Sequence, residues 1–266
     1  MAIIEEYKGA LFSTSHSIDK EPRDEDFKPH IHDYLELLCL VKGKVSYMVE
    51  GKIYKLSKGA LLLMRGSETH KLIVEQSSEY ERYVLNFRPE VLPSTLSGLL
   101  SPYFDRELGE RNLYLPSQLR VSPVEQFKRM YEEMAMLEPC EALVANLCSI
   151  LSSIKVVFLS GEDLSRENRY ENEIISYINK HITEPLSLSQ LSAELHLSTS
   201  QLSRSFKALT GTSIHSYILT KRLILFQEKL SQGKSALDAS LECGFKDYSS
   251  FYRLYKKRFG VSPTKR

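Results

Sequence analysis

Leu202-Ser-Arg204-Ser-Phe206-Lys207, followed by Gly211-Thr-Ser213, is the stretch that decides the fold, because the chain contains it twice. The second copy reads Phe251-Tyr-Arg253-Leu-Tyr255-Lys256 and Gly260-Val-Ser262, and each matched residue lies 49 positions after its counterpart. Fixed spacing over this length indicates a duplicated structural unit rather than a low-complexity segment.

Two short helices joined by a tight turn are expected around the first copy. Ser187 is placed to cap the first helix, with Gln190 three residues later, and Ser198 is placed to cap the second. His196 falls in the turn between them, where a positive φ is often required and His is tolerated. The side chains expected to face the core are Leu188, Leu191, Leu195, Leu202, Phe206 and Leu209.

The second copy predicts the same arrangement with different residues. Gly244 supplies the turn, Phe245 anchors the core, and Asp247 is the expected cap of the second helix. Between the copies, a long helix is expected from Ser213 through Leu230. Its apolar stripe predicts that it packs both units together: Ile214, Tyr217, Ile218, Leu225 and Phe226.

The outer faces of the second helix in each copy are polar and basic. A helix of this kind, following a tight turn, is suited to the major groove of double-stranded DNA. Two of them on one linker helix would read groove segments about 34 Å apart, so the binding site need not be a palindrome. The predicted DNA contacts are Ser200, Gln201, Ser203, Arg204, Lys207, Tyr248, Ser249, Tyr252, Arg253 and Lys256.

Residues 173–266 resemble the DNA-binding domain of the AraC/XylS family of bacterial transcription regulators. The matching residues are Ala193, Ser198, Leu202, Arg204, Phe206, Lys207, Gly211, Ser213, Tyr217, Arg222, Gly244, Phe245, Phe251, Arg253, Lys256, Gly260, Ser262 and Pro263. The resemblance implies promoter binding by two helix-turn-helix units and recruitment of RNA polymerase, as in an activator. The chain departs from the family pattern at the small residues Ala236, Ala239 and Ser240, and at Phe226, where the family usually has Ala. These departures bear on the stability of the second unit.

The charge distribution agrees with a polyanionic partner at the C-terminal end. The 266-residue chain has a formal net charge of only +1. Residues up to Ser165 carry 19 Lys and Arg against 25 Asp and Glu, whereas the residues after it carry 16 against 9. Such asymmetry between halves points to nucleic acid, and an ordinary basic surface is the alternative explanation.

The N-terminal part has the pattern of a small β-barrel. Short apolar runs in residues 30–90 are separated by Gly- and Ser-containing turns, and the first of them extends from His30 to Leu40. His30-x-His32-x3-Glu36, with His70 later in the chain, resembles the first motif of cupin barrels. On a regular strand, residues 30, 32, 34 and 36 share one face.

Three interpretations of this cluster are open: contact with a small effector, a structural role, or a metal site. The second cupin motif is only partial, because Arg65-Gly66 replaces the usual proline-containing turn and no Asn follows His70 at the expected place. We therefore expect a small polar effector such as a sugar, with no metal, no other cofactor and no catalytic residues. The expected effector-binding residues are His30, His32, Glu36, His70 and Arg82.

Two other functions fit parts of this pattern. One is a cupin metalloenzyme, such as an isomerase or dioxygenase, fused to a DNA-binding module. The other is a constitutive regulator whose barrel serves only in dimerisation. Metal analysis of the purified protein separates the first of these from an effector-responsive activator.

From Ser122 onward the apolar period becomes helical. Ser122, Pro123 and Glu125 predict a helix start, and a second helix follows Pro139. The apolar stripe of the second helix is Leu143, Leu147, Ile150, Leu151, Ile154, Val157 and Phe158. This stripe could cover the barrel alone or also dock on a second subunit, and its three-four spacing favours a homodimer.

The chain as a whole therefore predicts a two-domain α+β fold. Residues 1–159 form a cupin-like effector-binding domain, with a barrel at about 10–90 and dimerisation helices at about 122–159. The polar segment 160–172 is the expected linker, and residues 173–266 form an all-α domain with two helix-turn-helix units.

The cellular environment is also constrained. Cys39, Cys140, Cys148 and Cys243 show no paired spacing, which fits a reducing compartment. The N-terminus lacks the pattern of a signal peptide, and no run of about 18 apolar residues is apparent. A cytoplasmic protein without membrane contact is expected.

Overall fold

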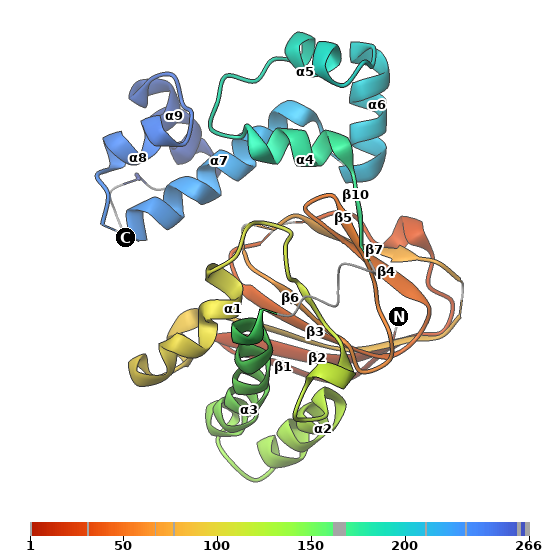
Figure 1. Cartoon of the computed structure of the whole chain (residues 1–266). Coiled ribbons are helices and arrows are strands. Elements are labelled where there is room, and N and C mark those ends of the chain that lie inside the picture. Colours follow the sequence, from red (N-terminus) through yellow and green to blue (C-terminus); the bar gives the residue numbers. More distant parts are fainter. Residues whose placement is uncertain are drawn as a thin grey trace. The chain divides into compact units, whose positions relative to one another are not determined.

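The computed structural model describes residues 2–30, 32–66, 68–76, 78–161, 169–210, 212–231, 233–259 and 262–263. The chain divides into two compact units, Met1–Glu171 and Asn172–Arg266 (Figure 1). Gly211, Gly260 and most of the expected linker, residues 162–168, lie outside the described residues.

The first unit is built around two antiparallel sheets (Figure 1). One has the strand order β1-β2-β8-β3-β6-β9 and the other the order β10-β5-β4-β7. The strands are β1 (Ala2–Lys8), β2 (Phe12–Asp19), β3 (Leu35–Lys42), β4 (Val45–Val49), β5 (Lys52–Lys55), β6 (Leu61–Met64), β7 (His70–Val74), β8 (Tyr80–Phe87), β9 (Leu113–Tyr114) and β10 (Arg169–Glu171).

Strand β3 lies between two apolar cores, which explains why it lacks the alternation of a half-exposed strand. Its residues Leu35 and Leu37 belong to the core under the helices, whereas Leu38 and Leu40 belong to the core between the sheets. Because side chains alternate along a strand, Glu36 is on the same side as Leu38 and therefore faces the interior of the barrel.

The helices α1 (Ser101–Phe104), α2 (Pro123–Met134) and α3 (Pro139–Ser160) pack against the six-stranded sheet (Figure 1). Ser122 caps α2 as predicted, and Pro123 follows it at the first helical position. The predicted stripe of α3 is buried in this core from Leu143 to Val157. The expectation that this same seam docks on a second subunit is therefore wrong, because the barrel already covers it.

Helix α3 is also long and apolar enough, by length and composition, to cross a membrane. This differs from the expectation that no such segment exists. Half of its apolar stretch is buried inside the protein, and the core helices of soluble domains often meet the same criterion.

Two boundaries of the first unit differ from those expected. The barrel includes β1, which begins at Ala2 rather than near residue 10. Part of the expected linker forms strand β10, in which Arg169–Glu171 pairs with Lys52–Tyr54 of β5. A three-residue strand of polar residues carries too short a pattern to be recognised in a sequence.

The second unit is helical in its described residues. Its helices are α4 (Glu173–Lys180), α5 (Leu188–Glu194), α6 (Thr199–Thr210), α7 (Ile214–Ser231), α8 (Ala236–Glu242) and α9 (Tyr248–Phe259). The predicted N-caps are confirmed, since hydroxyl or carboxylate oxygens of Ser187, Ser198, Ser213 and Asp247 accept main-chain N–H bonds three residues later. Leu188 is a correction, because it is 43% exposed rather than in the core.

Helix α7 joins the two helix-turn-helix units as predicted. Near its N-terminus, Tyr217 packs edge-to-face on Phe206 of α6, with ring centroids 5.2 Å apart. Toward its C-terminus, Phe226 packs against Phe251 of α9 at 4.4 Å. One helix thus contributes to the core of both units.

Candidate functional site

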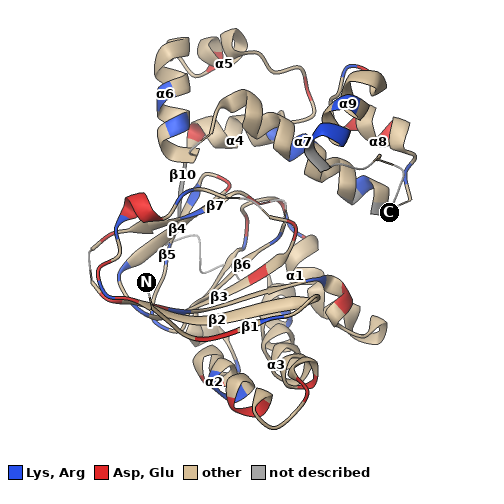
Figure 2. Cartoon of the chain, turned by 180° about the vertical axis from the view of Figure 1, so that it is seen from behind, with Lys and Arg blue, Asp and Glu red and all other residues tan. Residues whose placement is uncertain are grey.

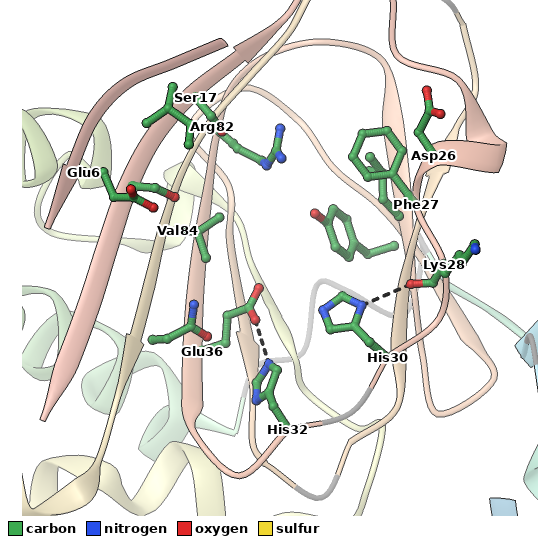
Figure 3. A pocket seen from close by; sticks show the side chains of 15 residues that line it. Glu6, Ser17, Asp26, Phe27, Lys28, His30, His32, Glu36, Arg82 and Val84 are labelled. Carbon is green, nitrogen blue, oxygen red and sulfur yellow. Dashed lines mark hydrogen bonds and ion pairs between the residues drawn. The ribbon is translucent and has the colours of Figure 1, made fainter. Parts of the chain in front are cut away.

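The interior of the barrel contains a cavity of about 400 Å³. Four of the five expected effector residues line it, His30, His32, Glu36 and Arg82, whereas His70 is completely buried and is not part of the lining. Figure 3 shows the first three close to one another, with Arg82 and Phe27 at the other end of the cavity in this view. The size and the mixture of polar and apolar walls suit a small organic molecule.

The histidine–glutamate cluster is assembled differently from the prediction. Strand β3 starts at Leu35, so His30 and His32 precede it and the premise of one regular strand is wrong. Instead, His30 makes an isolated bridge with His70 of β7, and their main-chain N–H and C=O groups exchange two bonds of 3.1 Å. The cluster therefore spans both sheets.

Gly66 allows the loop before β7 to approach the cluster. A Cβ at this position would lie 2.9 Å from the carbonyl oxygen of His32 and from the main chain of Asp33. Only a residue without a side chain fits so close an approach. The Arg65-Gly66 turn, which departs from the cupin pattern, therefore packs directly behind His32.

Glu36 is the centre of the cluster. Nε2 of His32 lies 2.8 Å from Oε2 of Glu36 and is hydrogen-bonded to it, and Nε2 of His70 lies 3.5 Å from the same oxygen. Glu36 and His70 are buried, His32 is half-buried and His30 is exposed. The ligand atoms of all four side chains lie within 4.8 Å of one another.

The pKa values of the cluster are shifted by burial and by the charges of its members. Burial alone would raise the pKa of Glu36, but His70 and the hydrogen bond from His32 hold it below its ordinary value. Burial alone would lower the pKa of His70, but Glu36 raises it. Although His30 is exposed, its side chain lines the cavity, and partial desolvation there, followed by the charge of His70, lowers the pKa of His30. Glu36 is therefore ionised at neutral pH.

The sequence pattern missed several residues that line the cavity. Val84 and Asn86 follow Arg82 at alternate positions of β8, and Ser15 and Ser17 of the neighbouring β2 lie on the same wall. Alternation along β8 could have identified Val84 and Asn86 once Arg82 was selected. The guanidinium of Arg82 stacks on the ring of Tyr80, 4.4 Å from its centroid.

A second buried carboxylate, Glu68, supports the cluster from behind. Both its oxygens bind Arg106, at 2.5 and 2.8 Å, and they also accept from Gly109 N and Asn112 Nδ2. Burial would raise the pKa of Glu68, but Arg106 lowers it to about 2. The carbonyl of Glu68 in turn accepts a 3.0 Å bond from Nδ1 of His70, so this network orients the imidazole.

In the helical unit Asn172–Arg266, the predicted DNA contacts of α6 lie on the exposed face of that helix. Ser200, Ser203, Arg204 and Lys207 are exposed, while Leu202 and Phe206 are buried on the opposite side. Gln201 is exposed but already engaged, because its Oε1 accepts from the main-chain N–H and the hydroxyl of Ser198. Its main role in this structure is to cap the helix.

Helix α9 presents a similar face with more aromatic character. Ser249, Arg253 and Lys256 are exposed, whereas Tyr252 is half-buried. Tyr248 is also half-buried and packs on the core of the second helix-turn-helix unit. The centroid of its ring lies 5.7 Å from that of Phe251. Figure 2 shows Lys and Arg on both α6 and α9.

Arg222 of α7 ties the two helix-turn-helix units together, a role that the sequence pattern did not indicate. Its guanidinium donates to the carbonyl oxygens of Ile182 and Glu184, just after α4, at 2.8 and 2.6 Å. It also donates to the carbonyl of Gly244, in the turn of the second unit, at 2.6 Å. The turn of the second helix-turn-helix unit is thereby held against the segment between α4 and α5, which leads into the first helix-turn-helix unit.

Comparison with known proteins agrees with this two-part organisation. A model of the AraC-like ligand binding domain matches residues 17–143, and a model of a helix-turn-helix domain matches residues 191–265. The probable transcriptional regulator LumQ of Photobacterium leiognathi is 24% identical over 92% of this chain and 94% of LumQ. The HTH-type transcriptional activator RhaS of Enterobacter sp. (strain 638) is 25% identical over 95% of this chain and 93% of RhaS.

Among solved structures, ToxT from Vibrio cholerae O395 covers 96% of this chain and 97% of its own at 12% identity, with a TM-score of 0.42. The relatives are transcription regulators, so the metalloenzyme alternative is not supported. With a ligand-binding domain matched at one end and a helix-turn-helix domain at the other, this chain belongs to the AraC family of DNA-binding transcription regulators.

Proposed function

We propose that this regulator is an activator that binds promoter DNA through both helix-turn-helix units and responds to a small polar effector, such as a sugar, in the barrel. The observation that carries the proposal is the repetition of one exposed Arg and one exposed Lys at equivalent positions of α6 and α9. The activator named RhaS among the relatives supports the sign of regulation.

The DNA contacts follow from what each exposed side chain offers. Arg204 and Arg253 can each bind a guanine edge in two places, which discriminates between bases. Lys207 and Lys256, one helical turn further along, suit phosphate contacts that position the helix. Ser200, Ser203 and Ser249 near the helix N-termini, with the partly exposed Tyr252, complete the proposed surface.

The effector is proposed to contact the polar wall of the cavity. Glu36 and the imidazoles of His30 and His32 accept or donate hydrogen bonds, and Arg82 of the neighbouring strand β8 offers a cation farther along the cavity. Asn86 and Ser17 add neutral polar groups, while Phe27 and Val84 supply apolar contact. A hydroxylated molecule with an apolar face fits this mixture.

A homodimer is proposed to form through the outer face of α3 rather than its buried stripe. That face is poor in charge, and it exposes Ala145, Ser152, Val156 and Leu159, of which Leu159 is 71% exposed. Val156→Glu should therefore give folded monomers in sedimentation, because a charge in an apolar interface is costly. Leu147→Glu should instead unfold the first unit, because Leu147 is in its core.

Recruitment of RNA polymerase by the DNA-bound dimer, in the cytoplasm, completes the proposal. Transcription in vitro from a promoter carrying a selected binding site tests it. The proposal expects more transcript with the regulator and effector than with RNA polymerase alone. Repression, or no change with occupied DNA, would contradict the activator role.

The effector response has its own test. Sugars and small organic acids are screened by thermal shift, since a ligand at 100 times its Kd should stabilise the first unit by about 2.7 kcal/mol. The active compound should change operator affinity by about 5- to 150-fold. His32→Ala with Glu36→Ala should abolish this change and leave effector-free DNA binding intact, whereas His16→Ala, on the outer side of the barrel, should retain it.

A further inference from the structure

The imidazoles of the cluster share an orientation that a hydrogen-bonding pocket alone does not require. Each ring uses Nδ1 to contact a main-chain carbonyl at 3.0–3.1 Å; the acceptors are Lys28 for His30, Tyr34 for His32 and Glu68 for His70. A carbonyl oxygen can only accept, so Nδ1 carries a proton in each ring and Nε2 is the atom left to bind an ion. In His32 the ion would replace the proton that Nε2 now donates to Glu36. Metal-binding histidines are held in this way by their surroundings.

The ligand atoms of the four side chains also converge on one place. Since the four ligand atoms lie within 4.8 Å of one another, one ion can lie among them. Ligands on opposite sides of such an ion, each bonded at about 2.1 Å, are about 4.2 Å apart. Small side-chain rotations would therefore bring all four atoms to bonding distance.

His70 supplies an independent observation. Its side chain is completely buried, yet Nε2 has no hydrogen-bond partner among the described residues. Buried polar atoms are almost always paired, so an unpaired one in a polar site calls for a missing ligand. This nitrogen lies 3.5 Å from the Glu36 carboxylate.

We propose that, contrary to the expectation drawn from the partial second cupin motif, His30, His32, Glu36 and His70 bind a divalent first-row transition metal ion, Fe²⁺, Ni²⁺ or Zn²⁺. Imidazole and carboxylate ligands without cysteine suit these ions. Because His30, His32 and Glu36 line the cavity, the remaining coordination positions of the ion face the space in which the effector is proposed to bind. The inference deepens the proposed function by naming the chemistry of its pocket.

The same domain contains a matched control site. Nε2 of His16 lies 2.8 Å from Oε1 of Glu81, and Nδ1 lies 3.7 Å from Glu5, so this site also joins imidazole and carboxylate. The neighbouring ring is Tyr83, stacked at 4.3 Å, rather than a second imidazole. His16→Ala should therefore leave metal binding unchanged.

The test titrates the full-length protein, stripped with a chelator, with Zn²⁺, Ni²⁺ or Co²⁺ alone and follows binding by calorimetry. One ion per chain is expected, and His32→Ala and Glu36→Gln should each weaken its Kd by at least tenfold. Co²⁺ should add visible absorption bands that both variants lose and His16→Ala retains. Circular dichroism of each variant verifies the fold.

Absence of stoichiometric binding by the wild-type chain would overturn the proposal, whatever the variants do. Binding that survives in both variants would also overturn it, because the ion would then occupy other surface groups. No DNA or effector is present, so failure here leaves the proposed regulation of transcription standing. Conversely, the ion can bind even if the effector screen finds nothing.

Discussion

The two helix-turn-helix units follow one pattern but are stabilised by different residues. The turn of the first contains His196 with a φ of 53°, whereas the turn of the second contains Gly244 with a φ of 84°. Helix α5 buries Leu191, while α8 buries only small side chains, Ala236, Ala239 and Ser240. The same backbone can thus be specified by two sets of contacts.

Phe226 fills the core volume that the small residues of α8 leave open in the second helix-turn-helix unit. It is completely buried in one cluster with Ala236 and Ala239, and its ring contacts Phe251 and Tyr255 at centroid distances of 4.4 and 5.4 Å. The departures from the family pattern are therefore complementary: a large side chain on α7 accompanies small ones on α8. These departures do not by themselves lower the stability of the second helix-turn-helix unit.

The largest effect is expected from Phe226→Ala. Removing a buried aromatic ring typically costs about 3–5 kcal/mol, and here the small neighbours leave the cavity open. Hydrogen exchange of the full-length chain should show faster exchange in α8 and α9 than in α5 and α6. Adding Ala239→Leu should restore part of the protection. If the double variant is no better than Phe226→Ala, the two departures are not complementary.

The turns should respond in opposite directions. Gly244→Ala should destabilise the second helix-turn-helix unit by about 2–3 kcal/mol, because the positive φ of this residue disfavours a side chain. Its Cβ would also lie 2.4 Å from the carbonyl oxygen of Thr183 and 3.0 Å from the guanidinium carbon of Arg222. His196→Gly should leave the stability of the first helix-turn-helix unit unchanged or slightly higher. Urea unfolding of both variants checks this, and equal destabilisation would contradict the contrast.

Arg204 and Arg253, which are proposed to contact base edges, are expected to act equivalently in the two helix-turn-helix units. Arg204→Ala and Arg253→Ala should each weaken binding to a selected operator by about 1–3 kcal/mol and affect random duplex less. The measurement is a mobility-shift assay at one fixed salt concentration. Equal losses on operator and random DNA would show that these side chains contact phosphates.

The smallest effects are expected from Lys207→Ala and Lys256→Ala. Loss of one phosphate contact should weaken binding to all sequences similarly and reduce the salt-dependence slope by about 1. Titration of operator and random duplex over several salt concentrations measures both. A sequence-dependent loss would transfer base reading from the arginines to these lysines.

The helical unit could be predicted in detail because its signals are local. Caps such as Ser187 and Ser198 act within three residues, and the turn at Gly244 depends on one φ angle. The role of Arg222 was not predictable, whereas the capping role of Gln201 was overlooked, although Ser198 and Gln201 have the same spacing as Ser187 and Gln190. Gln201 bonds to its own N-cap, and Arg222 reaches carbonyls on two separate segments.

The barrel illustrates the limits of periodicity. The histidine motif identified the cluster, but not the bridge between His30 and His70 that forms it. The stripe of α3 was recognised as apolar, yet the pattern alone could not distinguish packing on the barrel from packing on another subunit. The buried pair of Glu68 and Arg106 gave no signal, because its residues are 38 positions apart in polar segments.

Base reading by both helix-turn-helix units is tested most directly by selecting binding sites from random duplex DNA with the wild-type protein and with Arg204→Ala and Arg253→Ala. Each copy of the site that the wild type selects should contain two dissimilar segments about 10 base pairs apart, because one chain presents two different reading helices and each chain of the proposed homodimer reads one copy. Each variant should lose base preference in one segment only, and the two variants in different ones. Selection of a single segment, or relaxation of the same segment by both variants, would contradict reading by both units.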